Sequence, residues 1–229
     1  MIKRILFLII LTLFSSESCL GFGIGTVGVL GSGVVAATSS GNIDDFTGTQ
    51  APLATHDANW TASALGITNL ETSGSGALRL TGTYRSGSAY YAASTSDTSV
   101  ITVNSGVTDG YFQPRVCVRM SSTEDGYCFA LMEVGSGDWT DIAVYKNGST
   151  LCYLAGTYTT STTHELKIMA SGTSPVTIDA YVDGTDVTSS SCSDSTSPLP
   201  PGRNPGVAMY GASAGGYALN LVNDWRDYE

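Results

Sequence analysis

The sequence predicts an all-β protein, a two-sheet antiparallel sandwich or jelly roll, and three observations carry this prediction. Only 13% of the 229 residues are charged, about half the ~25% of an ordinary soluble domain. Short runs in which apolar and polar residues alternate recur between turn signals, as in half-buried strands. No window beyond the N-terminal region shows the 3.6-residue apolar period of an amphipathic helix. Many short strands of this kind are typical of sandwiches and jelly rolls.

The N-terminal region predicts a secretory signal over residues 1–21, because Lys3 and Arg4 precede a short apolar run that ends in small residues. The run is too short to span a bilayer, so we expect no membrane span once the signal is removed. Whether Cys19 carries a lipid is left open. A glycine-rich lead-in over 22–42 precedes one domain over 43–229. The protein is thus expected to be secreted, extracellular or periplasmic.

Three hairpins follow from strands that flank tight-turn dipeptides. Residues 176–182 alternate with period two before Asp183-Gly184, which predicts that Val176, Ile178, Ala180 and Val182 face the core. The other two hairpins turn at Asn147-Gly148 and Asp125-Gly126. Further strands are expected at 99–103, 166–169, 207–210 and 219–225. The proline-rich segment 189–205 is predicted to be a surface loop.

An exported chain with an even number of cysteines is expected to form disulfides. Cys117, Cys128, Cys152 and Cys192 allow three connectivities, and the sequence alone does not choose among them. The hairpin at Asp125-Gly126 brings Cys117 close to Cys128, which would leave Cys152 to pair with Cys192.

Charge and composition exclude several functional classes. A formal net charge of -10 argues against nucleic-acid binding, which needs a basic surface for phosphates. Two histidines and the lack of a Cys-x-x-Cys motif argue against a zinc or redox site.

Several short motifs occur in an order that resembles a known family. They are Asp44-Asp45-Phe46, Asn59-Trp60-Thr61, residues 115–120, residues 125–128, residues 181–185, residues 205–208 and Asn223-Asp224-Trp225. Together they resemble the concanavalin A-like lectin/glucanase superfamily, in particular laminin-G-like jelly rolls of bacterial, phage and environmental type. The resemblance implies two curved antiparallel sheets with the terminal strands side by side. It also implies a role in glycan binding, adhesion or structure, or, in some relatives, β-glucan hydrolysis.

The hydrolytic branch of that family carries Glu-x-Asp-x-x-Glu on one strand, and this motif is absent. The nearest pair, Glu133 and Asp138, is offset by five residues, which places the two on opposite faces of a straight strand. Glu124-Asp125 lies in a predicted turn. The sequence therefore predicts that the protein is not an enzyme, and β-glycan hydrolysis is kept as an alternative.

Aromatic side chains beside the predicted strands are the candidates for ligand contact. We select Trp139, Tyr145, Tyr153 and Tyr90, with Trp139 first because its flanking sequence indicates a turn. Trp60 and Trp225 are expected in the core.

No cofactor is expected, but a structural calcium ion is left open. Asp44, Asp45 and Asp224 would converge if the terminal strands pair, and carboxylates suit Ca²⁺.

The function that these observations favour is a secreted, non-catalytic β-sandwich module that binds a glycan or another surface ligand. Its partner would be a carbohydrate, a cell surface or a virion. A structural or virion-associated sandwich without a small ligand is the second interpretation. An aromatic platform on one sheet face would distinguish the first interpretation from the second.

Overall fold

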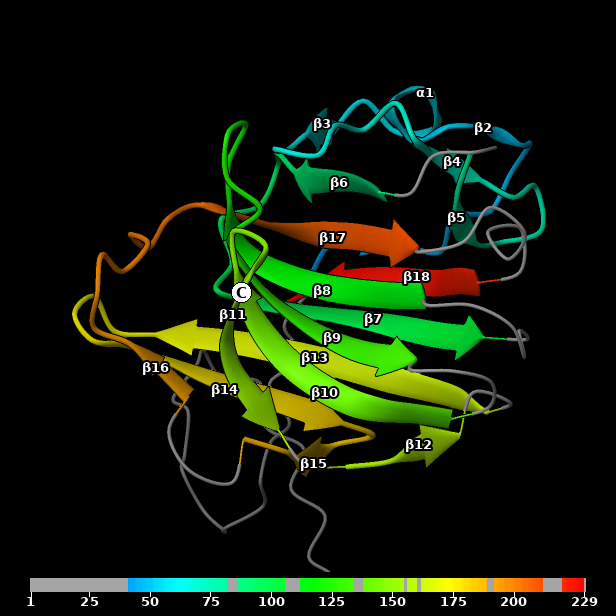
Figure 1. Cartoon of the computed structure of the whole chain (residues 1–229). Helices are drawn as coiled ribbons and strands as arrows, with labels where there is room; N and C mark the ends of the chain where they lie inside the picture. The colour runs from blue at the N-terminus through cyan, green and yellow to red at the C-terminus, as the bar shows by residue number, and fades with distance from the viewer. Residues whose placement is uncertain are drawn as a thin grey trace, which may run out of the picture. The chain divides into compact units, whose positions relative to one another are not determined.

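The computed structural model describes residues 41–81, 86–105, 112–133, 138–154, 156–159, 162–188, 192–211 and 220–228. The predicted signal, most of the lead-in and Cys19 lie outside these residues. The described residues belong to the compact unit Thr38–Glu229 and form two layers of antiparallel strands (Figure 1). The predicted all-β sandwich is confirmed. Within the described ranges, no helix is long and apolar enough to cross a membrane.

Sheet A holds both ends of the described chain. Its strands, in spatial order, are β15 (Thr185–Asp186), β14 (Val176–Val182), β13 (Thr163–Ser171), β7 (Thr98–Ser105), β18 (Asn220–Asp227), β5 (Leu78–Leu80), β4 (Leu70–Thr72) and β2 (Ala51–Pro52), with β1 (Ile43–Asp44) beside β18 and β16 (Cys192–Asp194) beside β14. A single short helix among the described residues, α1 (Leu53–His56), follows β2.

Sheet B is the second layer. Its strands, in spatial order, are β11 (Ser149–Leu154), β10 (Asp138–Lys146), β9 (Tyr127–Glu133), β8 (Phe112–Met120), β17 (Asn204–Gly211), β6 (Ser86–Tyr91) and β3 (Trp60–Ala62), with β12 (Tyr158–Thr159) beside β10. The three predicted hairpins are confirmed as β8–β9, β10–β11 and β14–β15.

The core lies between the two sheets and follows the period-two pattern. Along β14 the residues alternate between fully buried and half-buried, so Ile178 points inward while Thr177 lies partly in solvent. Val116, Phe129 and Val144 occupy the same core from sheet B. Because side chains alternate across a strand, the residues between them must face away from the core.

The expected pairing of the terminal strands is confirmed, since Asp44 stands opposite Trp225 in the β1–β18 pair. Trp60 packs against Trp225 with ring centroids 5.0 Å apart, and both indoles are buried, as expected. Asp44 is not a surface residue at this pair of strands, because it is only 8% exposed. Its carboxylate accepts hydrogen bonds from Trp60 Nε1 at 2.6 Å and from the Phe46 amide at 2.8 Å.

Two disulfides join described strands. Cys117 is bonded to Cys128 across the β8–β9 hairpin, and Cys152 of β11 is bonded to Cys192 of β16. The second bond links sheet B to sheet A. The prediction of one uninterrupted loop over 189–205 is wrong, because β16 lies within it and Leu199 is buried.

Candidate functional site

Three of the four predicted ligand-contact residues have described side chains. Tyr90 of β6 is half-buried, Tyr145 of β10 is 8% exposed, and Tyr153 of β11 is 74% exposed. The backbone of Trp139 pairs with Glu133 and Tyr158, but its side chain lies outside the description. Whether these residues bind a ligand stays a prediction.

The strand register places the three tyrosines on one surface, the side of sheet B that faces away from the core. Tyr153 stands opposite Ala143, which belongs to a small apolar cluster on that side. Tyr145 belongs to the same cluster, and Tyr90 and Tyr210 pack against it. We call this surface the tyrosine face and define it by Tyr90, Tyr145, Tyr153 and Tyr210 around Arg115.

Small residues form the floor of the tyrosine face. Arg115 lies between Ala208 of β17 and Ala130 of β9, and Ala143 stands next to Ala130 on β10. The short side chains leave room for longer ones to lie across the sheet. Gly206 on β17 is required at its position, because a Cβ there would lie 2.2 Å from the carbonyl oxygen of Ala89.

Arg115 occupies the centre of this surface and is only 5% exposed. The Cζ of its guanidinium lies 3.9 Å from the ring centroid of Tyr145 and 3.8 Å from that of Tyr210. Nη2 donates a hydrogen bond to Oε1 of Gln113 at 2.6 Å, while Nε is buried without a hydrogen-bond partner. Burial lowers the pKa of Arg115, and Tyr210, Tyr145 and Asp125 act in the opposite direction.

Burial also acts on the two tyrosines that enclose the arginine. It raises the pKa of Tyr145 and of Tyr210, with Arg115 opposing the shift in each case. Both phenols are therefore neutral at physiological pH and can donate as well as accept hydrogen bonds. The Tyr145 hydroxyl donates to the sulfur of Met132.

Two carboxylates border the tyrosine face. Asp125 is 5% exposed and accepts a hydrogen bond from Ser88 Oγ at 2.7 Å. Asp141 is exposed and stands opposite Met132, which belongs to the outer cluster. The side chains of Glu133 and Asp138 lie outside the description, so the hydrolase candidates from the sequence are not placed.

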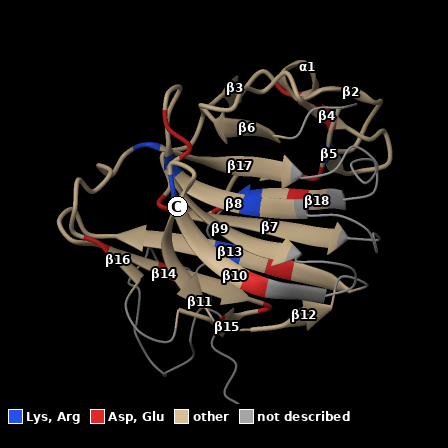
Figure 2. Cartoon of the chain, in the orientation of Figure 1, with Lys and Arg blue, Asp and Glu red and all other residues tan. Residues whose placement is uncertain are grey.

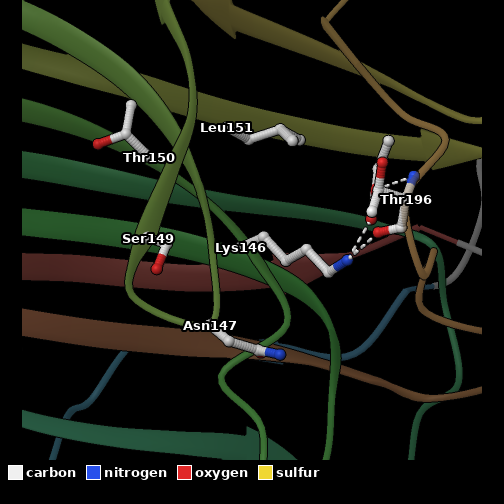
Figure 3. Close-up of a pocket in the computed structure, with 7 residues that line it drawn as sticks. Lys146, Asn147, Ser149, Thr150, Leu151 and Thr196 are labelled. Carbon is white, nitrogen blue, oxygen red and sulfur yellow. Dashed lines mark hydrogen bonds and ion pairs between the residues drawn. The ribbon is translucent and has the colours of Figure 1, made fainter.

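A second concave site lies at the β10–β11 turn, where a pocket of about 370 Å³ is found. Figure 3 shows the side chains that line it, among them Lys146, Leu151 and Thr196. Lys146 Nζ contacts Asp194 Oδ2 at 2.6 Å and donates to the carbonyls of Thr196 and Ser197 at 2.9 and 2.7 Å. All three ammonium hydrogens are thereby used, so this lysine stabilises the loop after β16.

The three aspartates considered as calcium ligands each form hydrogen bonds within the protein. Asp44 also contacts His56 Nε2 at 2.9 Å, Asp45 accepts hydrogen bonds from Thr47, and Asp224 accepts one from Thr102 at 2.9 Å. In the part of the chain that is described, no cluster of three or more potential ligands could hold a metal ion.

Sequence reasoning missed Arg115 and Tyr210, although the signal was present. Val116 and Val118 face the core, so the residues that alternate with them, Arg115 and Cys117, face outward. Tyr210 follows Met209, a core residue, and therefore also faces outward.

Comparison with known proteins shows the fold. No family model and no curated protein matches the sequence. An endo-β-galactosidase from Clostridium perfringens that releases GlcNAcα1-4Gal is similar in structure, with a TM-score of 0.51 and 14% identity over 87% of this chain and 65% of that one. A β-glucanase from Bacillus licheniformis has a TM-score of 0.47 and 14% identity over 84% and 99%. The carbohydrate recognition domain of Emp46p has a TM-score of 0.46 and 13% identity over 76% and 90%.

These comparisons overturn the prediction that the chain is not an enzyme. The endo-β-galactosidase, a glycoside hydrolase, has the same fold, so the fold is compatible with catalysis. The prediction depended on one missing motif on one strand. A sheet also brings carboxylates together from neighbouring strands, so the missing motif does not exclude catalysis.

The comparisons agree with the architecture seen directly. Two antiparallel sheets face each other, the first and last described strands pair in one of them, and the aromatic side chains of Trp60 and Trp225 close the core beside that pair. The chain has the concanavalin A-like jelly-roll fold.

Proposed function

We propose that this chain is a carbohydrate-binding β-sandwich and that the tyrosine face of sheet B holds the glycan. The observation that carries the proposal is the exposed ring of Tyr153 on the same sheet face as the Tyr145–Arg115–Tyr210 stack. An aromatic platform was the feature expected to distinguish ligand binding from a purely structural role.

The chemistry of the face suits a sugar. A tyrosine ring offers an apolar surface to the C–H groups of a pyranose while its hydroxyl remains a hydrogen-bond partner. Gln113 and the serines of β6 add polar groups beside the rings. Ligand sites in general combine an apolar surface with a few placed polar groups. The pocket at Lys146 lacks an aromatic surface, since the one apolar residue in its lining is Leu151.

The two disulfides support an oxidising location, because such bonds persist in exported proteins. Glycans exposed outside cells are available to a protein in that setting.

Glycan hydrolysis is the second candidate, and the observation that favours it is the pair of carboxylates at the tyrosine face. Asp125 is buried and Asp141 is exposed. Glycosidases use two carboxyl groups in different environments, one as acid and one as base or nucleophile. Binding and hydrolysis are therefore to be measured together.

The test is a panel of soluble polysaccharides assayed for binding by calorimetry and for hydrolysis by release of reducing ends. Tyr153→Ala should weaken binding about tenfold, or ~1.4 kcal/mol, since it removes an exposed stacking surface. Tyr181→Ala on the solvent side of sheet A is the matched control and should bind as the unmodified protein does. Asp141→Asn should abolish product release if hydrolysis is found. Equal losses in both tyrosine variants, or no binding to any glycan, would refute the proposal.

A further inference from the structure

Arg115 differs from the other described arginines in its partners. Arg79, Arg119, Arg203 and Arg226 each form an ion pair with a carboxylate. Within the described residues, no carboxylate lies within ion-pair distance of Arg115. Its side chain is nevertheless buried, with an exposure of only 5%. Arg226 also has a buried Nε without a partner, but its guanidinium is neutralised by Glu165. Arg115 is thus a buried cation whose charge is not directly paired with any carboxylate that the structure describes.

Burying an unpaired charge is costly, and the contacts of Arg115 offset only part of that cost. The rings of Tyr145 and Tyr210 supply two cation–π contacts to the guanidinium. Asp125 is a carboxylate that acts electrostatically on Arg115, and its Oδ1 already accepts a hydrogen bond from Ser88. The Nε hydrogen remains without an acceptor.

The stacking determines how a ligand can approach. Because two rings cover the guanidinium, a partner must come in its plane, where the N–H groups point. The planar fork of arginine matches two oxygens of one anionic group. At present Gln113 offers a single oxygen to Nη2 and leaves Nε unsatisfied. An anionic group that displaces the Gln113 amide would satisfy both nitrogens.

We propose that the tyrosine face selects glycans that carry an anionic group, held in the plane of the Arg115 guanidinium between Tyr145 and Tyr210. The shared chemistry is a carboxylate of a uronic acid or a sulfate ester on a sugar. This inference rests on the proposed glycan binding and names its ligand class. Long-range electrostatic attraction would not explain a preference for anionic glycans, because the chain itself carries a net charge of -10. Charged residues are also sparse along the strands (Figure 2).

The experiment compares three probes by calorimetry at low ionic strength: polygalacturonate, dextran sulfate and a neutral β-glucan. The unmodified protein should bind at least one anionic probe at least tenfold more tightly than the neutral one. The preferred anionic probe identifies carboxylate or sulfate as the group. Arg115→Met should bind the anionic probe no better than the neutral one. Arg79→Gln, on sheet A, is the control and should retain the preference.

A second variant keeps the proposal testable if Arg115→Met does not fold. Gln113→Glu places a carboxylate beside Nη2, where it competes with the ligand for the same N–H groups. It should raise the melting temperature and reduce affinity for the anionic probe at least tenfold, while Arg79→Gln again serves as the control that retains the preference.

The outcomes separate this inference from the function on which it rests. Equal affinity for neutral and anionic probes would overturn the inference and leave glycan binding intact. A preference that survives in Arg115→Met, or in Gln113→Glu, would overturn the role of Arg115. Lack of binding to all three probes, together with no binding across the wider panel, would overturn the proposed function itself.

Discussion

Strand β8 carries two buried arginines four residues apart, and their surroundings differ. Arg119 is 1% exposed and forms two bonds to Asp97, from Nε at 2.9 Å and from Nη2 at 2.8 Å. It also donates to the carbonyls of Leu199 at 2.8 Å and Gly172 at 3.0 Å. Among the described residues, Arg115 donates one hydrogen bond, to Gln113, and its Nε has no partner.

The difference between the two residues originates in the backbone. Arg119 has a φ of 56°, and the β17–β8 register shifts between Asn204 and Gly206 beside it. This irregularity interrupts the alternation, so Met120 joins Cys117 in the outer cluster and Arg119 reaches three loops instead. Four hydrogen bonds, which use all three guanidinium nitrogens, indicate a structural role for Arg119. The unsatisfied donor of Arg115 indicates a role that a ligand completes.

The largest effect is expected from Arg119→Met. The change removes both bonds to Asp97 and leaves the carbonyls of Leu199 and Gly172 without their donor. Breaking a buried ion pair costs about 3 to 5 kcal/mol of unfolding free energy. Urea denaturation followed by tryptophan fluorescence measures the loss. A change below about 1 kcal/mol would show that the four hydrogen bonds of Arg119 do not stabilise the fold.

The environment of Arg119 also shows where sequence-based prediction ends. The hairpins and the inward faces follow from alternation and turn dipeptides, which are properties of neighbouring residues. The partners of Arg119 lie 22, 53 and 80 residues away along the chain. No local pattern specifies such contacts, and the loop over 189–205 was accordingly predicted without β16 or the buried Leu199.

The candidate site was predictable only in part, for a related reason. Aromatic residues near turns identified Tyr145 and Tyr153, and alternation with Val116 could have placed Arg115 outward. Alternation does not say which outer residues come together across strands, because that depends on the register of β17 against β8. The stack of Arg115 on Tyr210 was therefore not predicted.

The disulfide between the two arginines gives the next largest effect. Cys117 lies midway between Arg115 and Arg119, and its bond to Cys128 closes 11 residues. Replacing both cysteines by alanine should cost about 3 kcal/mol, and the pair Cys152–Cys192, which closes 40 residues, about 4 kcal/mol. Thermal melting of the two double variants measures the difference. If chain entropy governs both bonds, loss of the longer link costs more, and the reverse order would contradict this.

Tyr127→Phe tests how much a second residue stabilises the loop around Leu199, to which Arg119 also donates a hydrogen bond. The Tyr127 hydroxyl accepts from the Leu199 amide at 2.8 Å and donates to Asp194 at 2.8 Å, so its loss should cost about 2 kcal/mol at neutral pH. Burial raises the pKa of Tyr127 to about 12, above the ordinary value of 10. The folded state therefore favours the neutral phenol, and its contribution is complete below pH 10 and lost as the pH rises toward 12.

Denaturation of the unmodified protein and of Tyr127→Phe at pH 8, 10 and 11.5 measures how the contribution of the Tyr127 hydroxyl to stability changes with pH. The stability difference between the two proteins should shrink as the pH rises. A difference that is constant over this range would mean that the phenol titrates alike in the folded and unfolded states.

A second titration bears on the same loop. Burial acts to raise the pKa of Asp194 and is the largest single influence, but hydrogen bonds from Lys146, Tyr127 and Thr196 together lower it. The folded state thus favours the carboxylate. Its stabilising contribution is present above the ordinary pKa of 3.8 and is lost as the pH falls below that value. In a series of melting curves at different pH values, Asp194→Asn should make the melting temperature fall less steeply below pH 3.8 than it does in the unmodified protein.

The smallest effect on stability is expected from Arg115→Met. The variant loses two cation–π contacts, which contribute about 0.5 to 2 kcal/mol each, but it also removes a buried donor that has no acceptor. The methionine side chain can still fill the space between Tyr145 and Tyr210 and contact both rings through its sulfur. We therefore expect a net change below about 1 kcal/mol in urea denaturation. A loss as large as that of Arg119→Met would show that Arg115 is a structural residue like Arg119, and the distinction between the two ends of β8 would no longer hold.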